Sequence, residues 1–94
     1  MTGSVYLLHF DRPYPRGRRP QHYLGWTIDL PARVYEHRQG YGGRLVDVMR
    51  LAGIGFEVAR TWPGDQALER RLKRRHKIAD ACPLCGVKPR GGQQ

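Results

Sequence analysis

A run of six residues near the start of the chain, Val5 to Phe10, most constrains the fold. The run is almost wholly apolar and too short for a helix of ordinary length, and Asp11 and Pro13 follow it. Short apolar runs bounded by turn residues are typical of strands that are covered on both faces. The sequence therefore predicts a buried strand that other elements cover on two sides.

Turn residues and apolar periodicity divide the rest of the chain into further short elements. The expected strands are residues 22–27 and 56–62, and the expected helices are residues 30 to about 39, 45–52 and 66 onwards. Asp29 and Asp65 are good N-caps for the first and last of these helices. Strands interspersed with helices indicate a domain of the α/β class.

Alternation along the strands predicts which side chains share a face. In the second strand Tyr23 and Gly25 point to one side, and Gly25 leaves a gap there that a bulge, another backbone or a phosphate can occupy. In the third strand Phe56, Val58 and Trp62 are expected to share a face.

The length of 94 residues predicts one domain with a single small core, over about residues 1–80. Residues 81–94 form a C-terminal segment, and its basic, Gly- and Gln-rich tail is expected to be disordered. No apolar run approaches the roughly 20 residues of a membrane span. No secretory-type sequence opens the chain, so we expect a cytoplasmic protein without a membrane partner.

The formal net charge of +9, from 17 basic and 8 acidic residues, indicates a polyanionic partner. A positive field gathers nucleic acid by counterion release whatever its sequence. A basic composition also occurs in proteins that bind acidic lipid, but no basic amphipathic helix of that type is evident. Nucleic acid is therefore the expected partner.

Five polar residues from separate elements are the candidate site: Tyr6, Tyr23, Arg33, His37 and Glu69. Each also has a simpler explanation. Tyrosines fill sheets, an Arg/His pair one turn apart is common on exposed helices, and Glu69 can form an ion pair with Lys73. Their order and spacing favour a functional site.

The pattern around these residues resembles the GIY-YIG endonuclease superfamily. Val5-Tyr6-Leu7-Leu8 and His22-Tyr23-Leu24-Gly25 are similar to its two signatures. Arg33 follows Gly25 by eight residues, the position of the family's catalytic arginine, and His37 stands four residues later, where a histidine is frequent. The run from Leu68 to Lys73 resembles the segment whose glutamate binds metal in the family. The resemblance spans about residues 5–77.

This resemblance implies a small three-stranded antiparallel sheet flanked by helices, in the order strand, strand, helix, helix, strand, helix. It also implies that Glu69 holds one Mg²⁺ or Mn²⁺, with no small-molecule cofactor, and that Arg33 clamps the phosphoryl group. We expect Tyr23 to act as the base or to orient water, with Tyr6 as its hydrogen-bonded partner. His37 then assists proton transfer or fixes the phosphate. The base can equally be Tyr6 on sequence grounds.

Basic residues on the long loop and the last helix are the candidates for DNA backbone contacts: Arg12, Arg16, Arg18, Arg19, Arg70, Lys73 and Arg74. Such contacts position DNA without reading its sequence. The expected substrate is branched or nicked DNA, recognised by shape, by a separate targeting partner or by a second subunit of a homodimer.

Cys82 and Cys85 form a Cys-x-x-Cys motif, half of the ligand set of a closed zinc site, and His76 is a candidate third ligand. A lone pair of thiols is also simply reduced cysteine.

Three functions follow. The first is an active endonuclease. The second is a catalytically weakened nucleic-acid-binding module, because the chain lacks the asparagine that often supports the family's site. The third is a zinc-stabilised interaction domain.

Overall fold

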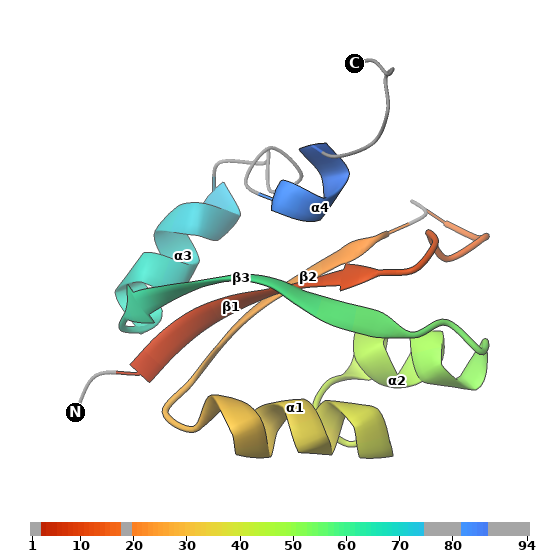
Figure 1. Ribbon diagram of the computed structural model, residues 1–94, viewed down its shortest axis with the longest axis horizontal. Helices are drawn as coiled ribbons and strands as arrows, with labels where there is room; N and C mark the ends of the chain where they lie inside the picture. The colour runs from red at the N-terminus through yellow and green to blue at the C-terminus, as the bar shows by residue number, and fades with distance from the viewer. Residues whose placement is uncertain (1–2, 18–19, 75–81, 87–94) are drawn as a thin grey trace.

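A computed structural model describes residues 3–17, 20–74 and 82–86 of the chain (Figure 1). Its elements, in chain order, are β1 (Gly3–Phe10), β2 (His22–Thr27), α1 (Leu30–Gln39), α2 (Arg44–Leu51), β3 (Phe56–Gly64), α3 (Gln66–Arg74) and α4 (Pro83–Gly86). The predicted α/β class and the predicted three-stranded antiparallel sheet with flanking helices are confirmed. The short helix α4 was not predicted.

The sheet has the strand order β2-β1-β3, with both pairings antiparallel. β1 is the central strand, and Val5, Leu7, Leu8 and Phe10 along it are completely buried. The prediction that this apolar run forms a strand covered on both faces is therefore confirmed.

Helices cover the sheet on both faces, with α1 and α2 on one side and α3 and α4 on the other (Figure 1). Each face has its own apolar cluster. The α1/α2 face buries Tyr6, Leu8, Phe10, Val46, Met49, Ile54 and Phe56. The α3/α4 face buries Val5, Leu7, Leu24, Leu72 and Cys82. The single core expected from the chain length is thus two clusters that share the central strand.

One register shift changes the predicted faces of β3. Leu7 pairs with Arg60 but the next residue, Leu8, pairs with Val58, so Ala59 is an extra residue on β3. Such a bulge reverses the alternation of side chains beyond it. Trp62 therefore packs in the cluster of the α3/α4 face, and the prediction that it shares a face with Phe56 and Val58 is wrong.

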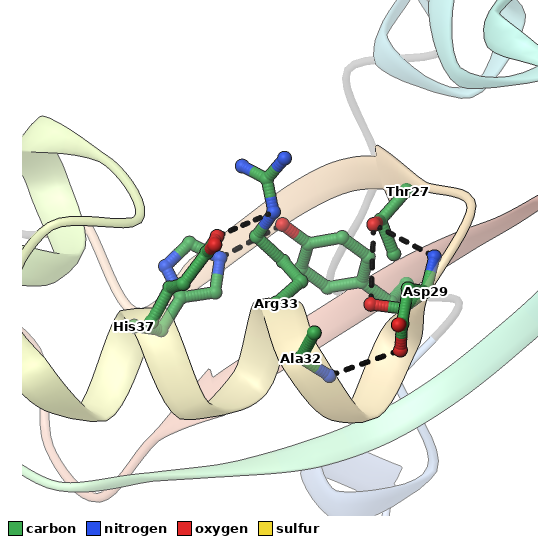
Figure 2. Close-up of polar contacts among 7 residues, drawn as sticks. Thr27, Asp29, Ala32, Arg33 and His37 are labelled. Atoms are coloured by element: carbon green, nitrogen blue, oxygen red, sulfur yellow. Dashed lines mark hydrogen bonds and ion pairs between the residues drawn. The ribbon is translucent and has the colours of Figure 1, made fainter.

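Helix α1, which carries two of the candidate site residues, begins and ends at well-defined caps. The Asp29 side chain accepts a hydrogen bond from the backbone N–H of Ala32 at 3.1 Å, and Thr27 contacts the backbone of Asp29 (Figure 2). Gly40 ends the helix in the left-handed conformation, at φ 95°. Glycine adopts this conformation without the steric penalty of a side chain. The caps fix where Arg33 and His37 stand relative to the sheet.

None of the helices that the structure describes has the length and apolar character needed to cross a lipid bilayer. Arg18, Arg19, His76 and the tail from residue 87 lie outside the described residues.

Candidate active site

The centre of the candidate site is a hydrogen bond between β1 and α1. The phenol oxygen of Tyr6 lies 2.8 Å from Nε2 of His37, and the two residues are 31 positions apart in the sequence. Tyr6 is 1 % exposed and His37 is 0 % exposed, so the bond is shielded from solvent. A shielded bond of this length holds both rings in one orientation.

Tyr23 of β2 completes a group of three rings, which we call the aromatic triad. Ring centroids are 6.2 Å apart for Tyr6 and Tyr23, 5.3 Å for Tyr23 and His37, and 5.7 Å for Tyr6 and His37. These separations are typical of tilted and edge-to-face aromatic contacts. Unlike the other two members, Tyr23 is only partly buried. It is therefore the member of the triad that a substrate can reach.

Three glycines make room for the triad. A Cβ atom at Gly25 would stand 2.5 Å from the Tyr6 hydroxyl, and one at Gly43 would stand 3.2 Å from the Tyr23 hydroxyl. A Cβ atom at Gly42 would collide with Nδ1 of His37. The gap predicted at Gly25 is therefore filled by the Tyr6 phenol. From the sequence, Gly42 and Gly43 were interpreted only as residues that break a helix. Two adjacent glycines after a helix can also indicate close packing, and that signal was missed.

His37 carries a buried atom without a partner. Among the side chains that the structure describes, one buried nitrogen or oxygen atom has no hydrogen-bond partner, and this atom is Nδ1 of His37. Leaving such an atom unpaired costs about 1–3 kcal/mol. Native proteins contain few of these atoms, and functional sites are among the places where they occur.

Burial sets the protonation states of the pair. The pKa of Tyr6 is raised far above its ordinary value, mainly by burial and then by Tyr23, while Arg33 opposes the shift and Glu69 adds to it. The pKa of His37 is lowered, first by burial and then by the Arg33 guanidinium, with Glu36 opposing. At neutral pH the pair therefore consists of a protonated phenol and a neutral imidazole.

Arg33 stands one helical turn before His37, and both side chains project from the same side of α1 (Figure 2). The Nε atom of Arg33 lies 3.3 Å from a carboxylate oxygen of Glu36, and both side chains are partly exposed. The guanidinium is close enough to affect the pKa values of Tyr6 and His37. It is a partly exposed cation beside the triad.

Glu69 stands on α3, on the opposite face of the sheet from α1 (Figure 1). Its side chain is 19 % exposed, and a carboxylate oxygen lies 2.9 Å from Nζ of Lys73. The ion pair that offered the simpler explanation for Glu69 is therefore present. The negative charge of Glu69 also raises the pKa of Tyr6, so the carboxylate acts on the triad electrostatically and not by contact.

The oxygen atoms here fit a hard divalent cation. Mg²⁺ is usually held by one or two carboxylates with water and substrate phosphate as the remaining ligands. Glu69 supplies one partly exposed carboxylate. This single carboxylate suits Mg²⁺ or Mn²⁺ bound largely through water.

The structure brings Tyr6, Tyr23 and His37 into direct contact and leaves Arg33 and Glu69 within electrostatic reach. A cavity of about 180 Å³ adjoins the site and is lined by His37, Arg38, Val46, Arg50, Ile54, Gly55 and Phe56. Of the five candidate residues, its walls include His37 and none of the other four.

The candidate DNA contacts lie on two separate surfaces. Arg12 and Arg16 are exposed on the loop between β1 and β2, where the Arg12 guanidinium also donates to the backbone oxygen of Ala52 at 3.3 Å. Arg70, Lys73 and Arg74 are exposed along α3. Backbone contacts by both groups require DNA to pass from the loop to the α3 side.

A second polar cluster was not predicted. His9 of β1, His22 of β2 and Cys82 direct ligand atoms toward one another on the α3/α4 face. Of the residues predicted to bind zinc, Cys82 is buried, His76 lies outside the described residues, and the side chain of Cys85 is likewise not described.

Comparisons with protein-family models, with curated proteins and with solved structures give no match for this chain. The geometry of its own residues is therefore the basis on which a function is proposed.

Proposed function

We propose that the protein is a metal-dependent endonuclease that hydrolyses DNA phosphodiester bonds through a GIY-YIG-like site. The observation that carries this proposal is the aromatic triad: Tyr6, Tyr23 and His37 were named from separate sequence segments, and they lie in contact. Support for the GIY-YIG-like label comes from the strand order β2-β1-β3 with helices on both faces.

The two tyrosines take different roles in this proposal. The buried Tyr6 phenol keeps its proton because its pKa is raised, so it serves as a structural partner that orients His37. The partly buried Tyr23 accepts the proton from the attacking water or orients that water. This assignment follows from burial, which sequence reasoning did not have.

The charged residues act on the phosphate. Arg33 binds the non-bridging oxygens of the phosphoryl group and offsets charge that develops there in the transition state. Glu69 holds the divalent cation. When bound, the cation polarises the phosphate and stabilises the departing alkoxide. Binding this cation requires Glu69 to exchange its ion pair with Lys73 for the metal.

His37 has an indirect role in this scheme. Its Nε2 is fixed by Tyr6, and its Nδ1 is buried without a hydrogen-bond partner, so neither ring nitrogen is open to a substrate. His37 therefore positions the Tyr6 phenol, and Tyr23 is the member of the triad that meets the attacking water.

The test is cleavage of supercoiled and branched DNA by Tyr23→Phe, with Tyr35→Phe as the matched control. Tyr35 is 60 % exposed, on the same helix as His37, so its hydroxyl is outside the triad. Loss of a general base or water-orienting group typically lowers the rate by a factor of about 10²–10⁴. We expect that loss in Tyr23→Phe with Mg²⁺ present, and none in Tyr35→Phe. Equal rates for the two variants would overturn the role of Tyr23.

A second candidate is a nucleic-acid-binding module that keeps the fold without cutting. The ion pair between Glu69 and Lys73 favours it, because a carboxylate held by a lysine is less available to a metal. This module predicts salt-dependent DNA binding with no cleavage in Mg²⁺ or Mn²⁺. The same plasmid assay with the unmodified protein separates the two candidates.

A further inference from the structure

The ends of β1 and β2 carry two histidines that face each other on the α3/α4 side of the sheet. His9 and His22 are directly paired across the two strands, and their rings meet edge to face with centroids 5.2 Å apart. Cys82, which is 3 % exposed, packs in the cluster of the same face, immediately before α4. Three residues from distant parts of the sequence thus meet at one point.

Atoms that bind metals are the ones that meet. Nδ1 of His9 lies 3.3 Å from Nε2 of His22 and 3.5 Å from Sγ of Cys82. One ligand atom of each of the three residues lies within 4.8 Å of those of the other two. Nδ1 of His9 is thus placed between the other two residues.

The separations agree with those around a tetrahedral zinc ion. Zinc–nitrogen bonds of about 2.0–2.1 Å and a zinc–sulfur bond of about 2.3 Å, at tetrahedral angles, place two ligand nitrogens about 3.4 Å apart and a nitrogen and a sulfur about 3.6 Å apart. The observed separations are 3.3 Å and 3.5 Å. Two ligand pairs therefore have the spacing of a zinc site.

We propose that His9, His22 and Cys82 bind a structural Zn²⁺ ion. Imidazole nitrogen and thiolate sulfur suit zinc, whereas the hard cations Mg²⁺ and Ca²⁺ prefer oxygen. Cys82 also opens a Cys-x-x-Cys motif, a spacing that recurs in zinc sites. These three ligands leave one position of the tetrahedron for a further donor.

The ion would fasten the C-terminal segment to the sheet. Helix α4 has only four residues, which is far too short to be stable alone. Leu84 packs on the cluster that holds Cys82. A metal bridge from the strand pair to Cys82 would add a second anchor for α4. Zinc binding then stabilises the folded protein, because the unfolded chain does not bring these ligands together.

The site is distinct from the proposed active site. His9 and His22 are on the α3/α4 face of β1 and β2, and the aromatic triad is on the α1/α2 face. The ligand types differ as well. The proposal therefore holds or fails independently of DNA cleavage.

The first experiment measures metal in the full-length protein purified from zinc-supplemented medium, and then the absorption spectrum after replacement by Co²⁺. We expect one zinc per chain, a thiolate-to-cobalt charge-transfer band, and the intense visible bands of tetrahedral Co²⁺. X-ray absorption of the zinc form should give two nitrogen neighbours and at least one sulfur neighbour. These measurements use the unmodified chain and so do not depend on the folding of any variant.

Variants then identify the ligands. His22→Gln should weaken Co²⁺ binding at least 100-fold, and His76→Gln, the matched control, should leave it unchanged. Substoichiometric zinc with no charge-transfer band would overturn the site. If His22→Gln binds Co²⁺ tightly and His76→Gln does not, the proposed site is overturned. The metal would then be bound by the ligands predicted from the sequence. The absence of a sulfur neighbour would overturn the role of Cys82.

Discussion

The two faces of the β1–β2 pair carry different chemistry from nearly the same sequence positions. On β2, His22 and Tyr23 are consecutive, yet His22 points to the α3/α4 face and Tyr23 to the α1/α2 face. On β1, Tyr6 joins the triad and His9 joins the cluster with Cys82. One face collects phenols and an imidazole beside charged groups, and the other collects nitrogen and sulfur ligands.

The comparison teaches how a short chain separates two sites. Side chains alternate across a strand, so neighbours in sequence can serve two sites that never touch. The two faces also differ in what closes them. Helix α1, capped at both ends, contributes His37 to the triad, whereas Cys82, which contacts His9, is followed by the four-residue helix α4. The proposed zinc ion would tie this short helix to the sheet.

The largest expected effect is that a variant on each face loses one property, DNA cleavage or bound zinc, and keeps the other. Tyr23→Phe should lower cleavage by a factor of about 10²–10⁴ and leave zinc content unchanged, because its hydroxyl is on the other face. Cys82→Ser should lose zinc while the fraction that remains folded cleaves at close to the normal rate. Zinc content and plasmid nicking are measured on the same samples. Both values are corrected for the folded fraction, which circular dichroism gives. Loss of both properties in Tyr23→Phe would show that the two faces are not independent.

A smaller effect is expected from Gly25→Ala, which tests the close packing under the triad. The added Cβ atom would stand 2.5 Å from the Tyr6 hydroxyl, so the phenol must move. Overpacking of this kind costs about 1–3 kcal/mol, measured as the free energy of unfolding in urea. In a Tyr6→Ala background the obstruction is gone, and Gly25→Ala should then have little effect. An equal loss in both backgrounds would mean that Gly25 acts through the strand backbone instead.

Acid should destabilise the α1/α2 face through His37. Its pKa is lowered in the folded state from the ordinary 6.5, so the unfolded chain binds the proton more tightly. The contribution of neutral His37 is fully present above that ordinary value and is lost as the pH falls below it, with a slope of at most about 1.4 kcal/mol per pH unit.

Urea unfolding of the normal protein and His37→Gln between pH 7.5 and 5 isolates this contribution. Every other group is common to both proteins, so the difference between the two proteins reports His37. A stability difference that does not change with pH would contradict a buried neutral imidazole.

The smallest expected effect is on DNA binding by the loop. Replacing its arginines by glutamine at positions 12, 16, 18 and 19 should weaken binding similarly for all DNA sequences. The slope of log K against log salt should flatten by about 0.9 for each DNA phosphate that the loop no longer neutralises. Fluorescence anisotropy over a salt series measures the slope. An unchanged slope would place the DNA elsewhere, with α3 as the remaining basic surface.

Much of the fold was predictable because it depends on local signals. The apolar run of β1, the Asp29 cap and the apolar spacing of α2 are readable in one short window each. The bulge at Ala59 was not, because a register shift depends on how β1 and β3 twist against each other. The resulting position of Trp62 was therefore predicted wrongly.

The candidate site was predictable only in its membership. Tyr6, Tyr23 and His37 were predicted from the sequence. The roles proposed for them follow from their burial, and burial depends on how α1 lies on the sheet. The role of Gly42 appears only once His37 is in place. The meeting of His9 with Cys82 requires the C-terminal segment to return to the start of the sheet, 73 residues away in sequence, and no local pattern signals that return.

The most direct test of the proposed nuclease site is plasmid cleavage in Mg²⁺ by Glu69→Gln against Asp47→Asn. Both changes remove one negative charge from a helical ion pair, that of Glu69 with Lys73 and that of Asp47 with Arg50. Only Glu69 lies near the triad and affects the Tyr6 pKa. We predict that the unmodified protein and Asp47→Asn cleave at similar rates, that EDTA stops both, and that Glu69→Gln loses at least about 100-fold in rate. Metal-dependent cleavage by Glu69→Gln at the normal rate would contradict the proposed site.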